Sequence, residues 1–189
     1  MNVQEATTRR LPDLKERHLP ENCRETINTI LKETYGYEQF RNLEIYDDLS
    51  KGKEKLCISQ GQLIENVILE AEKAWKGETQ VDNILLTAPT GSGKSLLFQL
   101  PAIYLGKEYN LLTIVVSPLK ALIVDQVESL QELGYMRVAY ASSDLSPEQK
   151  MEVYRQVREG EIDLFYLSPE LLLSYDIKHF VGERRIGLV

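Results

Sequence analysis

The spacing of apolar residues along the chain changes character near Gly77. Before this point, two stretches carry apolar side chains at helical intervals, and they predict helices over residues 21–34 and 62–75. The charged stretch 42–55 between them is interpreted as an insertion or a loop. Residues 1–20 have mixed charge and two prolines, which indicates an arm or a loosely docked segment.

After Gly77, short apolar runs alternate with amphipathic segments. The runs predict strands over 83–88, 111–117, 137–141, 162–167 and 185–189. The segments between them predict helices over 94–105, 119–133 and 146–158, and a short helix from Pro169. This alternation predicts an α/β fold, a parallel sheet with helices on both faces. Ligands of such sheets bind at the carboxyl ends of the strands.

A glycine-rich turn follows the first predicted strand, where the chain reads Ala88-Pro-Thr-Gly-Ser-Gly-Lys-Ser95. A strand, a glycine turn and Lys-Ser opening a helix form the geometry that holds a nucleoside triphosphate. The glycines let successive N–H groups face phosphate oxygens, the lysine reaches the outer phosphates, and the last serine is a ligand for Mg²⁺. Ala88 stands where the strict pattern has glycine. The residues expected to hold ATP and Mg²⁺ here are Thr90, Gly91, Ser92, Gly93, Lys94 and Ser95.

Composition narrows the function classes. The content of 43% hydrophobic and 27% charged residues is ordinary for a soluble globular protein, which leads us to expect a cytoplasmic protein without a membrane segment. A net charge of −7 argues against polyanion binding over the whole surface but leaves room for a local basic face. Cys23, Cys57, His18 and His179 do not have metal-ligand spacing and are expected to have no catalytic role.

Further motifs follow the later strands. Ser117-Pro-Leu-Lys-Ala-Leu122, with Asp125-Gln126, comes after the second strand, and Tyr166-Leu-Ser-Pro-Glu170 comes after the fourth. With the glycine-rich turn and Leu100-Pro-Ala102, they resemble the first, RecA-like motor domain of superfamily 2 helicases of the DEAD/DEAH type. Leu31-Lys-Glu-Thr-Tyr-Gly-Tyr-Glu-Gln-Phe-Arg41 narrows the resemblance to RecQ-type DNA helicases, over roughly residues 22–41 and 58–189.

The resemblance implies an adenine site upstream of the glycine-rich turn. Tyr37 and Arg41 match the residues that flank the adenine ring, and Gln62 matches the glutamine that reads its edge. A carboxamide offers one donor and one acceptor, which suits adenine better than guanine. About twenty residues separate Arg41 from Gln62, where the family has them nearly adjacent. The alternatives are a core aromatic for Tyr37 and a surface residue at a helix start for Gln62.

The resemblance also implies contacts with DNA, single-stranded or at a duplex junction. The candidates follow two strand ends, and they are Ser117, Pro118, Leu119, Lys120, Ser168, Pro169 and Glu170. Serine hydroxyls, backbone N–H groups and a lysine are typical phosphate contacts. The alternative is a pair of Ser-Pro turns that only cap helices. Ser142, Ser143 and Asp144 form a further polar loop at a strand end, with a weaker case for touching the DNA backbone.

ATP hydrolysis in this family needs an Asp-Glu pair, expected directly after the strand over 185–189, where the chain stops. We therefore expect residues 1–80 to be a helical segment with the adenine motif and a charged insertion, and 81–189 a RecA-like ATP-binding domain that ends before that pair. The parent protein is expected to unwind DNA, and these residues alone are expected not to turn over ATP. The alternatives are a nucleotide-binding module of a non-helicase ATPase and an inactive regulatory fragment.

Overall fold

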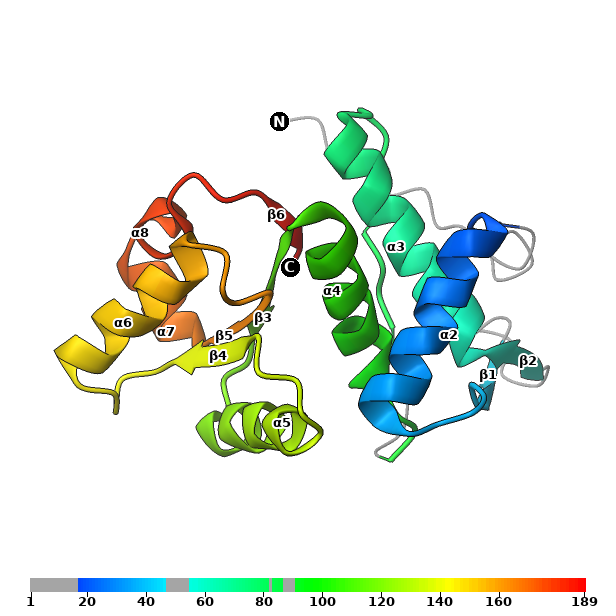
Figure 1. Ribbon diagram of the computed structural model, residues 1–189, viewed down its shortest axis with the longest axis horizontal. Helices are drawn as coiled ribbons and strands as arrows, with labels where there is room; N and C mark the ends of the chain where they lie inside the picture. Colours follow the sequence, from blue (N-terminus) through cyan, green and yellow to red (C-terminus); the bar gives the residue numbers. More distant parts are fainter. Residues whose placement is uncertain (1–16, 47–54, 82, 87–90) are drawn as a thin grey trace.

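The computed structural model describes residues 17–46, 55–81, 83–86 and 91–189 (Figure 1). The elements before the glycine-rich turn are α2 (Glu21–Tyr35), β1 (Asn42–Tyr46), β2 (Lys55–Ser59) and α3 (Gln60–Lys76). Those after it are α4 (Leu96–Tyr109), β3 (Leu112–Val116), α5 (Lys120–Glu132), β4 (Val138–Ala141), α6 (Pro147–Arg158), β5 (Leu164–Leu167), α7 (Pro169–Ser174), α8 (Ile177–Val181) and β6 (Ile186–Leu188). No helix in the described ranges is both long and apolar enough to cross a membrane.

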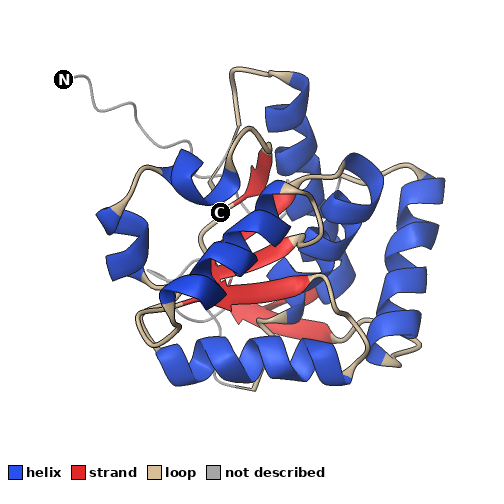
Figure 2. Cartoon of the chain, turned by 60° about the vertical axis from the view of Figure 1, so that its left-hand side comes forward, coloured by secondary structure: helices blue, strands red, loops and turns tan. Residues whose placement is uncertain are grey.

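The main sheet is parallel, with the strand order β4-β5-β3-β6, and it confirms the predicted α/β class. The strand β5 shows why the runs are continuously apolar. Its side chains alternate between faces, so that Leu164 and Tyr166 join the core beneath α4 and α5, while Phe165 and Leu167 join the core beneath α6, α7 and α8. Helices therefore cover both faces of the sheet (Figure 2).

The helix α4 lies between two cores. On its outer side, Leu100 and Ile103 pack in one cluster with Ile64 of α3 and with side chains of α2. On its inner side, Ala102 packs with Tyr166 of the sheet and with apolar residues of α5. The helices α2 and α3 thus form a further layer outside α4, which Figure 1 shows beside the sheet.

The predicted start of α6 is confirmed by its capping groups. The Ser146 hydroxyl accepts a hydrogen bond from the Gln149 N–H at 3.2 Å, and the Gln149 side chain accepts one from the Ser146 N–H at 2.8 Å. Pro147 occupies the first helical position, where its missing N–H costs nothing. The local sequence alone therefore defines where this helix begins.

The interpretation of 42–55 as a loop is wrong for its described part. Residues Asn42–Tyr46 and Lys55–Ser59 form an antiparallel pair, β1 with β2, in which Leu43 lies opposite Ile58. Ile58 is buried and Leu43 packs against the core formed with α2 and α3. The alternation of apolar and charged residues in this stretch is that of a ribbon with one covered face, and the high charge obscured it. Residues 47–54 lie outside the described ranges.

The predicted strand over 83–88 is not formed in the residues that the structure describes there. Residues 83–86 have no regular structure, and Ile84 and Leu85 are 49% and 91% exposed. A strand needs a neighbour to satisfy its backbone groups, and none of the described strands pairs with these residues. Residues 87 and 88 lie outside the described ranges.

A partly buried group of charges connects the amino ends of the strands. Arg137, Asp163 and Arg184 precede β4, β5 and β6, and with Tyr135 they form a group that we call the Asp163 cluster. The Asp163 carboxylate accepts hydrogen bonds from Arg137 Nε at 2.6 Å, from Arg184 Nη2 at 2.9 Å and from the Tyr135 hydroxyl at 3.1 Å. Burial and this carboxylate raise the pKa of Tyr135, so that its hydroxyl stays a donor.

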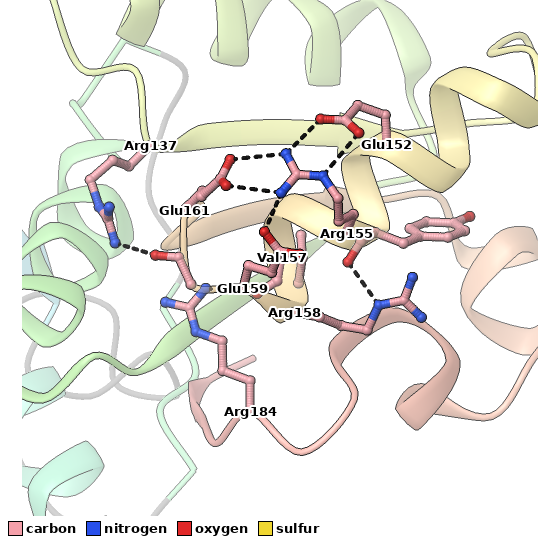
Figure 3. Close-up of polar contacts among 10 residues, drawn as sticks. Arg137, Glu152, Arg155, Val157, Arg158, Glu159, Glu161 and Arg184 are labelled. Atoms are coloured by element: carbon pink, nitrogen blue, oxygen red, sulfur yellow. Dashed lines mark hydrogen bonds and ion pairs between the residues drawn. The ribbon is translucent and has the colours of Figure 1, made fainter.

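An exposed group of charges lies next to the Asp163 cluster. Arg155 of α6 forms ion pairs with Glu152, Glu159 and Glu161 (Figure 3). Figure 3 also shows Arg137 and Arg184 approaching the turn after α6, where Arg137 Nη2 donates to the Gly160 carbonyl at 2.6 Å. Exposed pairs of this kind are screened by water and add little stability.

Candidate nucleotide and nucleic-acid site

The described part of the glycine-rich turn opens α4 at the carboxyl edge of the sheet. Only Asn110 and Leu111 join α4 to β3, so the helix runs antiparallel to the strands and its first turn lies where the strands end. Gly91 and Gly93 have φ angles of 80° and 78°, which residues with a side chain rarely adopt. Thr90, a predicted contact, lies outside the described ranges.

Backbone hydrogen bonds start the helical turn at the second glycine. The Leu96 N–H donates to the Gly93 carbonyl at 3.2 Å, and the Leu97 N–H donates to the Lys94 carbonyl at 3.0 Å. The N–H groups of the residues before Leu96 therefore make no hydrogen bond within α4. They are left as donors at the positive end of the helix dipole. The exposed Lys94 adds charge at the same place.

Two serine hydroxyls of the turn fit a phosphate and its metal ion. The Ser95 side chain makes no capping hydrogen bond to α4, although Ser95 is the N-cap residue. The Ser92 hydroxyl is buried and makes no hydrogen bond with the described residues. A buried hydroxyl without a partner is costly, and an anionic oxygen would satisfy it. The donor set of the turn thus suits a phosphate group.

The structure brings together two of the three predicted adenine contacts. The Arg41 guanidinium carbon lies 6.0 Å from the centre of the Tyr37 ring, within reach of a cation–π interaction. Tyr37 is 49% exposed and lies nearly parallel to Tyr35, with 6.5 Å between the ring centres. An exposed ring beside a guanidinium can take up a planar base, whereas a core aromatic would be covered.

Gln62, the third predicted contact, faces another side of α3. Its side-chain amide donates to the Arg17 carbonyl at 2.8 Å. It also lines a hollow of about 220 Å³ together with Arg24, Asn28 and Phe40, to which neither Tyr37 nor Arg41 contributes.

Gln60 is the glutamine that lies against the turn, and it was not among the predicted contacts. Its Oε1 accepts from the Arg41 N–H at 3.2 Å, and its Nε2 lies 3.3 Å from the Ser92 carbonyl and 3.4 Å from the Gly93 carbonyl. Gln60 is 2% exposed. A Cβ at Gly93 would come within 2.6 Å of this amide, so the turn and Gln60 are packed closely. The only signal in the sequence was the repeated glutamine in Ser59-Gln-Gly-Gln62.

The predicted nucleic-acid residues lie in a row. Val116, Leu167 and Ala141 are partners across β3, β5 and β4, so the next residues, Ser117, Ser168 and Ser142, end these strands at one level. Neighbouring strands lie about 4.8 Å apart, which sets the spacing of the three serines. The Ser117 N–H donates to the Leu167 carbonyl at 3.1 Å, which extends the sheet to this level. We call these three residues the serine row.

Of the serines in the predicted motifs, Ser168 caps a helix and Ser117 closes the turn before one. Ser168 Oγ accepts from the Leu171 N–H at 3.4 Å, with Pro169 as the first residue of α7 and Glu170 in its first turn. Ser117 Oγ accepts from the Leu119 N–H at 3.4 Å, while Pro118 and Leu119 are exposed. Capping and phosphate contact are compatible, since a hydroxyl that accepts one hydrogen bond still has a proton to donate.

Lys120, the cation of the second motif, is held by the loop after β4. Its ammonium group donates to the Ser143 hydroxyl and lies 3.3 Å from Asp144 Oδ1. The Ser142 hydroxyl, the Asp144 backbone and Lys120 lower the pKa of the Asp144 carboxyl, with the Ser142 hydrogen bond the largest cause. The polar loop predicted as a minor contact is therefore joined to the second motif.

A buried glutamine connects the adenine side with the nucleic-acid side. Gln99 of α4 accepts from the Tyr35 hydroxyl at 3.3 Å and donates to Gln126 Oε1 of α5 at 3.0 Å. Its Nε2 also lies 3.3 Å from the hydroxyl of Tyr166, whose pKa burial raises to about 12. Gln126, noted in the sequence as part of a motif, thus links α4 to the helix that follows the serine row.

The chain has relatives among known proteins. Residues 60–187 match the family model of the DEAD/DEAH box helicases. The chain is similar to the ATP-dependent DNA helicase RecQ of Synechocystis, with 32% identity over 87% of this chain and 28% of the relative. It is also similar to the proteins of that name from Haemophilus influenzae, with 30% identity over 87% and 21%, and from Bacillus subtilis, with 32% over 78% and 20%. The chain thus spans between a fifth and about 28% of these relatives.

Proposed function

Because the chain belongs to the DEAD/DEAH box helicase family, we propose that it is the ATP-binding part of a RecQ-type motor that unwinds DNA. The observation that carries the proposal is the shared edge of the sheet. The turn at Gly91–Ser95 and the serine row both lie where the strands end, so that a nucleotide and a DNA strand can be held by one rigid sheet.

On the nucleotide side, we assign the phosphates to the N–H groups of the turn and to Lys94. The Ser95 hydroxyl would hold Mg²⁺, which supplies positive charge to the outer phosphates when bound. Tyr37 and Arg41 would enclose the adenine ring, which their cation–π contact supports. Gln62 is assigned to the adenine edge by resemblance, and Gln60 to holding the turn against Arg41.

On the nucleic-acid side, we assign DNA phosphates to Ser117 and Ser168 of the serine row and to Lys120. Support comes from the common level of the three serines and from the exposed residues beside them. As contacts to phosphate, these groups would carry no sequence information, so the chain is expected to bind DNA with little sequence preference. A motor that moves along DNA needs this property.

The chain is therefore expected to bind single-stranded DNA with an affinity that falls as salt rises, because each neutralised phosphate releases counterions. Fluorescence anisotropy with a labelled oligonucleotide, between low and physiological salt, measures this. Lys120→Ala should weaken binding and flatten the salt dependence, whereas Lys107→Ala, at the far end of α4, should not. A chain that binds ATP but no DNA at any salt concentration would favour a nucleotide-binding module of another ATPase.

The two glutamines are expected to differ in their effect on base selectivity. If Gln62 reads adenine, ATP outcompetes GTP, and Gln62→Ala narrows the gap by roughly 1–3 kcal/mol, the cost of leaving a matched polar group unpaired. Gln60→Ala should instead weaken both nucleotides by the same factor, because it loosens the turn and leaves the base edge untouched. Competition binding with both nucleotides measures the ratio. If the ratio of ATP affinity to GTP affinity falls in Gln60→Ala and stays constant in Gln62→Ala, then Gln60, and not Gln62, reads the adenine edge.

A further inference from the structure

The loop between β4 and α6 places more polar groups beside Lys120 than the helicase motifs account for. Ser142, Ser143 and Asp144 follow β4, the outermost strand of the sheet on this side. Ser142 is 1% exposed and forms the end of the serine row, while Ser143 and Asp144 are exposed. The loop therefore continues the edge at which we place DNA.

Two ammonium groups converge on Ser143 from different helices. Lys120, at the start of α5, donates to the Ser143 hydroxyl, and Lys150, in the first turns of α6, lies 3.4 Å from the Ser143 carbonyl. Lysines at this spacing around a hydroxyl and backbone dipoles are the groups that phosphates contact in protein–DNA complexes. Lys150 was not among the residues expected to contact DNA, and Ser143 was only a weaker candidate.

Asp144 supplies a carboxylate next to Lys120. It lies 3.3 Å from the Lys120 ammonium and accepts a hydrogen bond from the Ser142 hydroxyl. The Lys120 and Asp144 side chains are 49% and 54% exposed, so water screens their attraction. The Asp144 carboxylate therefore occupies the place where an anionic oxygen of a ligand would bind. Because its attraction to Lys120 is weak, the phosphate of a ligand displaces it easily.

We propose that Lys120, Lys150 and Ser143 form a subsite for a backbone phosphate of DNA, and that Asp144 occupies it in the free chain. The proposal rests on the proposed function, since it extends the same DNA track over β4. A phosphate that enters must displace the Asp144 carboxylate, and the carboxylate then repels the DNA nearby. Asp144 thereby lowers the affinity for DNA and lets the strand leave the edge more readily.

The test is the substitution Asp144→Asn, which removes the charge and keeps an acceptor for the Ser142 hydroxyl. Binding of labelled single-stranded DNA is expected to tighten about three- to tenfold at low salt, and log affinity against log salt is expected to steepen by about 0.7, the value of one more phosphate contact. Lys150→Ala should weaken binding and flatten the slope by a similar amount. Glu132→Gln, with the same charge change at the other end of α5, is the matched control and should leave affinity within about twofold.

An oligonucleotide with neutral methylphosphonate linkages separates phosphate contact from other effects, and it should bind wild type and Asp144→Asn alike. Equal tightening by Asp144→Asn and Glu132→Gln would show a general charge effect and overturn the subsite. So would a wild-type chain that binds DNA with an affinity unchanged by Asp144→Asn or Lys150→Ala. Absence of DNA binding in every variant would overturn the proposed function together with the subsite.

Discussion

Replacing Lys94 with alanine is expected to lower the affinity for ATP–Mg²⁺ roughly 10- to 150-fold, since a hydrogen bond to a charged group contributes about 1.5–3 kcal/mol. Lys94 stands at the amino end of α4, beside the two glycines with positive φ, where the helix offers its N–H groups. The loss should be largest for the triphosphate and smallest for AMP, because the lysine reaches the outer phosphates. Isothermal titration calorimetry with ATP, ADP and AMP measures the series.

Lys107→Ala is the control for this experiment, because it removes the same charge from the last turn of α4. It should bind ATP as the wild type does. Equal ATP affinity in wild type and Lys94→Ala would contradict the assignment of the turn as a phosphate site, and with it the proposed function.

Asp163→Asn is expected to cost about 3–5 kcal/mol of unfolding free energy, because it leaves a buried cation without its counter-charge. The Arg184 side chain is 5% exposed and Asp163 is 3% exposed, so water cannot replace the lost partner. Burial already lowers the pKa of Arg184, and the Asp163 carboxylate opposes that effect. Urea denaturation followed by circular dichroism measures the change.

Two further variants make the interpretation of this loss specific. Glu152→Gln removes a carboxylate from the exposed Arg155 pairs and should leave the denaturation midpoint nearly unchanged. Asp163→Asn combined with Arg184→Met removes both charges and should recover part of the stability. If Asp163→Asn lowers the unfolding free energy by less than about 1 kcal/mol, the Asp163 cluster does not stabilise the fold through its charges.

Local chemistry made several elements predictable. The helix α6 begins where Ser146, Pro147 and Gln149 satisfy the first backbone groups, which needs no knowledge of the rest of the fold. The strand β5 is apolar at every position because both faces are covered, and this pattern is visible in the sequence. The residues of the glycine-rich turn were recognised for the same reason, since the turn needs glycine at fixed positions.

The misses depended on contacts between distant residues. The run Ile84-Leu85-Leu86 is apolar enough for a strand, but a strand forms only beside a partner, and no described strand pairs with this run. Gln60 and Gln62 are two positions apart on a helix and face different directions, so the packing of α3 decides which one meets the turn. Lys120 and Asp144 are 24 positions apart in the sequence, and no local sequence pattern predicts their contact.

The position of α4 between two cores has a consequence for the entropy of ligand binding. Packing on both sides already fixes the backbone of its first turn, so the binding of a phosphate does not have to order the donors there. The same arrangement makes the turn sensitive to distant changes. A cavity opened on either side of α4, beside Ile64 or beneath Ala102, would loosen the helix that carries the turn and would appear as weaker nucleotide binding, although no residue of the site had changed.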